Sequence, residues 1–178
     1  MPDVSSYEAT IQSLKDGTIS ALGVSIDSKA ITLGTKLTKK ETQSTPTLTL
    51  PPSLNGQDGT YTVIALDIDA PFVSWNALSP IVHWVQTDLK PTSAQEGEPT
   101  RLETTEAPVI PWLPAGPPPG AAPHRYVFFL YKQEKEIPGA MKGKGVARLS
   151  RMKFDLSKML GELGLEGNVV AENWFVAN

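Results

Sequence analysis

Three stretches of the chain combine apolar, β-branched and aromatic residues over the length of a single strand. They are YTVIALDID (residues 61–69), IVHWVQTDL (81–89) and HRYVFFLYKQ (124–133). Such runs, bounded by turn-forming residues, are typical of buried strands. Shorter β-type runs, VSI, AITLG and TPTLTL, precede them, and NVVAENWFV (168–176) forms a last candidate strand. The pattern therefore predicts a domain built mainly from strands.

Two helices are predicted, one near each end of the chain. A short N-terminal helix over residues 6–15 carries its apolar side chains at helical spacing, at Tyr7, Ile11 and Leu14. The second helix has apolar residues at i, i+3, i+4 and i+7: Leu156, Met159, Leu160 and Leu163. Asp155 is placed to cap this helix and Gly164 to end it. Strands followed by one late helix predict a mainly β (α+β), largely antiparallel fold, in a single domain over residues 1–178.

Residues 91–123 interrupt these patterns. Seven prolines lie between Pro108 and Pro123, which excludes helix and central strand from that part of the segment. An exposed proline-rich linker is one interpretation. However, the apolar side chains of Val109, Ile110 and Trp112 favour a loop that packs against the domain.

Composition narrows the function classes. The chain has 178 residues and a net charge of −3, which gives no global reason to expect nucleic acid as a partner. It has no cysteine, which excludes disulfides, thiolate nucleophiles and cysteine-ligated metals. No apolar run is long enough to cross a membrane and no signal-peptide pattern opens the chain, so the expected location is cytoplasmic.

Polar residues within the candidate strands point to a site. Because side chains alternate along an extended strand, Asp67 and Asp69 are predicted to share one face. The only two histidines, His83 and His124, lie within or open two of the strongest strands. If these strands are neighbours, carboxylates and imidazoles meet at one concave spot. A carboxylate would keep a histidine protonated or oriented, and imidazolium groups donate hydrogen bonds to an anion.

Other interpretations of these residues remain open at this point. The two histidines are unrelated core residues in the simplest alternative. Two His and two Asp are also a possible donor set for a divalent metal, although residues spread over separate strands carry no metal-binding spacing. A third alternative is an enzyme that uses the Asp/His cavity for acid–base chemistry on a small metabolite. We expect neither a metal nor a cofactor, and no motif assigns a catalytic residue.

A locally basic stretch runs from Lys142 to Lys158. It includes Arg148 and Arg151, and only Asp155 opposes it. Such a stretch is commonly a solvated face. It is also suited to peripheral contact with anionic lipid or with an acidic partner.

Taken together, several motifs resemble the phosphatidylethanolamine-binding protein family. They are DIDAP (67–71), a histidine before an aromatic residue at His83, GPP (116–118) and HRYVF (124–128). The resemblance implies a large Greek-key antiparallel sheet packed on a smaller sheet. It also implies a small surface cavity that binds phosphate-like anions or phospholipid headgroups. The ligand-binding residues carried over by motif are Asp67, Asp69, Pro71, His83, Gly116, Pro118, His124 and Tyr126.

The resemblance also implies a regulatory role without catalysis, in which the protein inhibits a protein kinase or a serine carboxypeptidase. The chain departs from the family pattern beside DIDAP, where Phe72 and Val73 replace the usual Ser/Thr-Arg pair and remove a positive charge from the rim. Trp75 is expected to contribute an aromatic wall. The sequence stops soon after the NWF strand, without a further C-terminal helix, so we expect an open cavity mouth.

Overall fold

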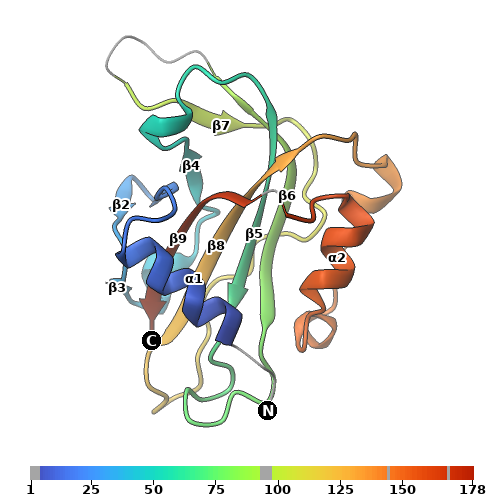
Figure 1. The fold of residues 1–178 in the computed structure, drawn as a ribbon. Helices are drawn as coiled ribbons and strands as arrows, with labels where there is room; N and C mark the ends of the chain where they lie inside the picture. Colours follow the sequence, from blue (N-terminus) through green and yellow to red (C-terminus); the bar gives the residue numbers. More distant parts are fainter. Residues whose placement is uncertain (1–4, 93–97, 144, 168) are drawn as a thin grey trace.

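The predicted strands assemble into one mixed sheet in the computed structural model, which describes residues 5–92, 98–143, 145–167 and 169–178. Within these residues the sheet has nine strands in the order β2-β1-β4-β7-β6-β5-β8-β9-β3 (Figure 1). The strands are β1 Gly23–Ile26, β2 Lys29–Ile31, β3 Thr35–Leu37, β4 Thr47–Thr49, β5 Thr60–Asp67, β6 Ile81–Pro91, β7 Arg101–Glu103, β8 His124–Gln133 and β9 Val169–Ala177. The helices are α1 Ser5–Lys15 and α2 Leu156–Leu163, with 3-10 turns η1 Lys39–Thr42, η2 Pro52–Leu54, η3 Gly139–Met141 and η4 Arg148–Arg151. The mainly β fold class is confirmed.

The sheet bends back on itself at β6. Most of β6 pairs with β5, but its last residues pair with β7, which joins the short strands β2, β1, β4 and β7 to the long ones. In the described part of the chain, all pairings between strands are antiparallel except β3 with β9, which is parallel. A larger part of the sheet thus packs on a smaller part, as predicted.

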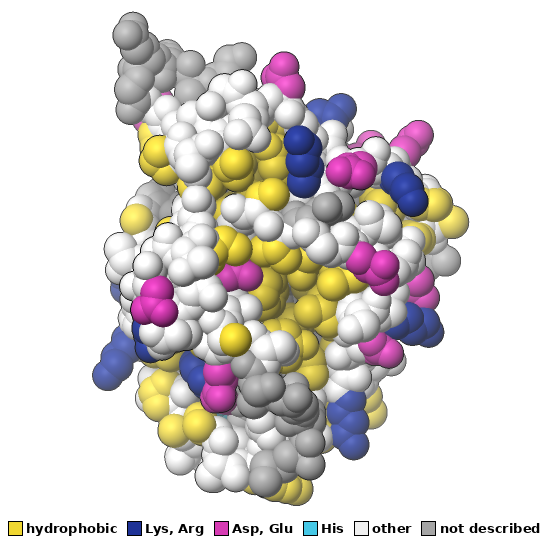
Figure 2. Space-filling view, viewed as in Figure 1, with side chains coloured by type: hydrophobic (Ala, Val, Ile, Leu, Met, Phe, Trp, Pro, Cys, Tyr) yellow, Lys and Arg dark blue, Asp and Glu magenta, His cyan; other side chains and the backbone are white. Residues whose placement is uncertain are grey.

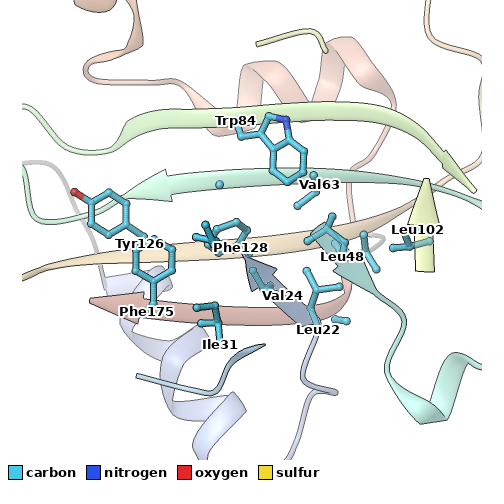
Figure 3. Close-up of a cluster of buried hydrophobic side chains, with 14 of the residues drawn as sticks. Leu22, Val24, Ile31, Leu48, Val63, Trp84, Leu102, Tyr126, Phe128 and Phe175 are labelled. Carbon is cyan, nitrogen blue, oxygen red and sulfur yellow. The ribbon is translucent and has the colours of Figure 1, made fainter. Parts of the chain in front are cut away.

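The main core fills the space between the two parts of the sheet. Figure 3 shows Val24 and Leu48 of the short strands facing Trp84, Phe128 and Phe175 of the long ones. Phe128 and Phe175 are fully buried, and their ring centroids lie 5.8 Å apart. Buried aromatic side chains of this size contribute several kcal/mol each (about 3–5 kcal/mol on truncation to alanine), so this cluster holds the two parts together.

The two helices cover the outer face of the larger part. Ile11 of α1 and Leu163 of α2 belong to one apolar cluster with Leu66 and Phe129 of the sheet. Figure 2 shows apolar side chains exposed between the helices. The predicted helix signals are confirmed: the Asp155 carboxylate accepts a hydrogen bond from the Lys158 N–H at 2.9 Å, and Gly164 has a φ of 64°. That left-handed conformation favours glycine at a helix end.

The proline-rich segment packs on the domain, as predicted, although residues 93–97 lie outside the described part. Ile110 is buried and pairs with Val85 of β6, and the Trp112 indole N–H donates to the Thr42 carbonyl at 3.0 Å. The sequence did not predict β7 within this segment. Its three residues form a strand because they join β6 to β4.

Candidate functional site

A cavity of about 190 Å³ opens where β5 ends and where β6 and β8 begin. Antiparallel pairing places Asp67, the last residue of β5, opposite Ile81 and Tyr126. This edge of the sheet lies at the bottom of Figure 1. The cavity is lined by Asp67, Ala70, Pro71, Leu78, Ile81, His83, Leu113, Pro114, Gly116, Pro118, His124, Arg148 and Met152. The walls are largely apolar, and the polar side chains that line the cavity are those of Asp67, His83, His124 and Arg148.

Asp67 and His124 form a buried pair at the floor of this cavity. The His124 Nδ1 atom lies 2.9 Å from Asp67 Oδ2, and Nε2 lies 3.1 Å from the Pro71 carbonyl oxygen. Because both partners are acceptors, both ring nitrogens donate and the ring is an imidazolium. Burial lowers the pKa of His124, but the hydrogen bond to Asp67 and its negative charge outweigh burial and raise this pKa overall. His124 therefore supplies positive charge, with neither N–H group left for a ligand.

His83 is held in the opposite protonation state. Its Nδ1 lies 2.6 Å from the Leu113 carbonyl oxygen and donates to it, while the ring packs edge-on against Tyr126 at 5.0 Å. Burial lowers the pKa of His83 and outweighs the attraction of Asp67, so the ring is neutral at pH 7. Nε2 makes no hydrogen bond with any described residue. It is an open acceptor in the cavity wall.

Asp69 does not line the cavity. Strand β5 ends at Asp67, so the alternation that predicted a shared face for the two carboxylates does not extend to Asp69. The Asp69 carboxylate instead receives the Arg125 side chain at 2.7 and 2.8 Å and the Arg125 backbone N–H at 2.8 Å. The backbone N–H of Asp69 in turn donates to Asp67 Oδ1 at 2.9 Å. Asp69 thus fixes the strand end that positions Asp67.

Tyr126 also lies behind the cavity wall rather than in it. The ring stacks on Phe175 at 5.0 Å and is fully buried. Its hydroxyl makes no hydrogen bond within the described residues, and Figure 3 shows it pointing away from the core cluster. Burial, followed by the negative charge of Asp67, raises the pKa of Tyr126, so the hydroxyl stays protonated.

The structure adds Arg148 to the predicted site residues. Arg148 lies in η4, lines the cavity and approaches Gly116, where an added Cβ would lie 3.4 Å from its Nη2. It forms no hydrogen bond or ion pair with the described residues, and it is exposed. The basic composition of residues 142–158 was the only sequence signal for it. The positions of the basic residues in the sequence did not indicate which Lys or Arg side chain reaches the cavity.

The basic residues of the stretch 142–158 do not form a single surface in the structure. Lys142 bridges Asp88 and Glu106, at 3.0 Å from each, in a separate groove of about 620 Å³. Arg151 is buried and donates to the carbonyl oxygens of His83 and Pro111 at 3.2 and 2.9 Å. The interpretation of a wholly solvated face is therefore wrong for Arg151, which braces the strand that carries His83. Lys144 lies outside the described residues.

Comparison with known proteins decides the family. The family model described as phosphatidylethanolamine-binding protein matches residues 27–173. The chain belongs to this family. The phosphatidylethanolamine-binding protein (PEBP) resemblance drawn from DIDAP, GPP and HRYVF is thereby confirmed.

Among PEBP relatives, the carboxypeptidase Y inhibitor of Saccharomyces cerevisiae is 30% identical over 131 residues, which cover 67% of this chain and 60% of that protein. An uncharacterized protein of the same yeast, YLR179C, is 32% identical over 71% of this chain and 64% of its own length. The chain thus aligns with less than two thirds of either relative. The crystal structure of carboxypeptidase Y inhibitor complexed with its cognate proteinase matches with a TM-score of 0.71 and 26% identity, over 96% of this chain and 95% of that one.

The PEBP fold is shared more widely than the sequence. A phosphatidylethanolamine-binding protein from Plasmodium vivax matches with a TM-score of 0.66 at 18% identity, over 94% of this chain and 96% of that chain. The fold class predicted from the sequence is confirmed by these matches. The ligand-binding roles of the eight predicted residues stay predictions, whether they line the cavity or, like Asp69 and Tyr126, lie behind it.

The described residues contain no group of three or more His, Asp or Glu side chains arranged to hold a metal ion. For acid–base chemistry, the candidate base is the open Nε2 of His83, because both nitrogens of His124 are occupied.

The position of Trp75 also differs from expectation. It does not line the cavity but projects from the rim, with 56% of the residue exposed.

Proposed function

We propose that this PEBP chain binds a phosphate-bearing small molecule in the cavity of Asp67, His83, His124 and Arg148. The observation that carries the proposal is the guanidinium of Arg148, which has no ion-pair partner among the residues that the structure describes and lines a small cavity with largely apolar walls. Arginine suits phosphate because its planar donors match two oxygens at once. Apolar walls exclude water and strengthen that attraction.

The charges of the cavity favour an anion. The imidazolium of His124 balances the carboxylate of Asp67, which leaves the positive charge of Arg148 without an opposing charge among the described residues that line the cavity. The open Nε2 of His83 is suited to accept a hydrogen bond from a ligand N–H or O–H group. A ligand with a phosphate at the mouth and a donor further in, such as phosphoethanolamine or monohydrogen phosphate, satisfies both groups.

Titration of labelled protein with phosphoethanolamine, and separately with inorganic phosphate, tests this proposal by NMR. We expect the amide signals of Asp67 and His124 to move with either ligand. Arg148→Ala is expected to weaken binding by about 10- to 100-fold, the value of a lost charge-assisted hydrogen bond of about 1.5–3 kcal/mol.

Arg101→Ala is the matched control, because Arg101 is an exposed arginine in β7, at the opposite end of the molecule in Figure 1. The Arg101→Ala variant is expected to bind both ligands with the affinity of the native protein. The absence of any shift at millimolar concentrations of both ligands contradicts the proposal. If both arginine substitutions weaken ligand binding equally, the effect of Arg148→Ala is a nonspecific effect of net charge, which also contradicts the proposal.

Inhibition of a serine carboxypeptidase is a second candidate function, supported by the similarity to the yeast inhibitor and to its structure in the proteinase complex. Purified chain added to yeast carboxypeptidase Y is expected to reduce peptide hydrolysis in proportion to the inhibitor added. Repeating the assay with Arg148→Ala separates a cavity-dependent mechanism from an independent surface. Full hydrolysis at a large molar excess of folded protein contradicts this candidate function.

A further inference from the structure

We infer that a groove at the end of the molecule opposite the cavity binds an extended, cationic peptide. The groove consists of two adjoining hollows, of about 620 and 280 Å³, and Glu103 and Thr104 line both. It lies along residues 84–90 of β6, beside β7, which Figure 1 shows at the opposite end from the cavity. Hollows of this size with a few convergent polar groups are typical of binding sites.

The smaller hollow has apolar walls and an open hydrogen-bond donor. Leu48, Leu89 and Leu102 line it together with Trp84, which is only 4% exposed. The indole N–H of Trp84 donates to no residue in the described part of the chain, and Figure 3 shows the nitrogen on the ring edge that points away from the core cluster. Buried indole N–H groups normally have a hydrogen-bond partner. A ligand that carries a carbonyl group supplies one.

Gln86 adds a hydrogen-bond acceptor to the same wall. Trp84 and Gln86 are two residues apart in β6, so their side chains point to the same face of the sheet, about 7 Å apart. The Gln86 amide is held in place, since its Nε2 donates to the carbonyl oxygens of Thr87 and Glu106 at 3.1 and 3.2 Å. Its Oε1 accepts from none of the described residues. An extended peptide offers alternating C=O and N–H groups along one edge, which match this donor and this acceptor.

The larger hollow favours positive charge. Five acidic and three basic side chains line it, an excess of two negative charges. Lys142 is already committed to two of the carboxylates, at 3.0 Å from each. Glu103, Glu134 and Glu136 are exposed, and none of them forms an ion pair with another described residue. These three carboxylates attract a Lys or Arg side chain of a bound peptide.

A peptide fits this groove better than a lipid or a nucleic acid does. The excess of carboxylates repels the phosphate groups of both. Neither described helix is long and apolar enough to cross a membrane. Because the two hollows meet at Glu103 and Thr104, an apolar side chain in the smaller hollow lies next to a cation in the larger one. The inferred ligand is therefore an extended segment in which a bulky apolar residue is followed by Lys or Arg.

NMR titration of labelled protein with the peptide acetyl-Pro-Leu-Arg-Lys-amide tests the inference. We expect the amide signals of Gln86, Glu103 and Thr104 to move and those of Asp67 and His124 to stay in place, so the result is independent of phosphate binding at the cavity. Trp84→Phe removes the indole donor and keeps an aromatic ring, and it is expected to weaken peptide binding about fivefold, the effect of one lost hydrogen bond. Glu103→Gln is expected to weaken it about threefold at low salt, as for an exposed ion pair.

Glu162→Gln is the matched control, because Glu162 is an exposed glutamate of α2 that does not line the groove. This variant is expected to bind the peptide like the native protein, and the acidic peptide acetyl-Pro-Leu-Glu-Glu-amide is expected to cause no shift. Thermal midpoints check the fold of each variant, and Glu103→Gln, at an exposed position, tests the groove without altering the core. The inference is overturned if the cationic peptide causes no shift at millimolar concentration or if the acidic peptide binds equally well. Native affinity in the Glu103→Gln variant at low salt also overturns it.

Discussion

Replacing Asp69 by alanine is expected to lower the free energy of unfolding by about 3–5 kcal/mol, the typical cost of removing one partner of a buried ion pair. The Asp69 carboxylate is almost fully buried, with 1% of its side chain exposed, and it accepts hydrogen bonds from the Arg125 guanidinium and backbone. The alanine variant leaves the guanidinium, whose side chain is only 24% exposed, without its main partner. Thermal unfolding measures the effect as a fall in the midpoint of roughly 10 °C.

Glu8→Ala provides the control, because Glu8 contacts the same arginine from α1. That contact is longer, at 3.3 Å, and the Glu8 side chain is 55% exposed. An exposed ion pair contributes less than about 1 kcal/mol, so the midpoint is expected to move little. Asp69→Asn, which keeps the shape and one acceptor, is expected to fall between the two. Equal effects of Asp69→Ala and Glu8→Ala are inconsistent with a stabilising role specific to Asp69.

Glu172→Gln is expected to stabilise the protein increasingly as pH rises, relative to the native chain. Glu172 lies in β9 opposite Phe129, is 5% exposed, and its Oε2 has no hydrogen-bond partner within the described residues. Burial raises its pKa from the ordinary value of 4.5 to about 7. The folded state therefore holds this proton more tightly than the unfolded state does.

The direction of the pH effect follows from this difference. Below pH 4.5 the carboxyl is protonated in both states, and the stability that it contributes is fully present. Between pH 4.5 and about 7 the unfolded chain releases the proton first, so native stability falls; above pH 7 it is constant. The loss approaches about 3 kcal/mol, since each tenfold shift in proton affinity is worth about 1.4 kcal/mol.

Denaturant unfolding at several pH values measures this effect as the difference in free energy between Glu172→Gln and native protein. That difference is expected to grow between pH 4.5 and 7, because glutamine does not ionise. Glu134→Gln, at an exposed glutamate, is the control and is expected to give a small difference that does not vary with pH. A constant difference for Glu172→Gln across this range rules out a buried protonated carboxyl.

The parts of the fold that were predicted correctly are those with a local sequence pattern. The run 124–133 became β8 with its predicted bounds, and the signals at Asp155 and Gly164 marked the ends of α2. Strands β3 and β7 have three residues each, too few to show a period. Both exist because distant strands offer them hydrogen bonds, which a local pattern does not contain.

The same distinction applies to the candidate site: residues within locally patterned strands were predicted, and those placed by distant contacts were not. Asp67, His83 and His124 were predicted to converge if their three strands were neighbours, and the structure pairs these strands and brings the three side chains to one cavity. Asp69 was misplaced because strand periodicity does not reveal that β5 stops two residues earlier. Arg148 was not assigned to the cavity, since it comes from a 3-10 turn that no sequence pattern marked. The chain just after this turn is held by long-range backbone hydrogen bonds, from Lys153 to the Leu78 carbonyl and from Phe154 to the Pro80 carbonyl.

The parallel pairing of β3 with β9 constrains how the protein is made. Leu37 pairs with Ala177, and the Lys39 N–H donates to the carbonyl of Asn178. Strand β3 is synthesised early, but it cannot form these hydrogen bonds until the residues of β9 have been translated. Such pairings between distant segments slow folding, because loop closure must precede any gain from the contact. On the ribosome, the edge beside β8 stays unpaired until residues 169–177 leave the exit tunnel. During synthesis the nascent chain therefore presents an unprotected strand edge that a chaperone is suited to shield.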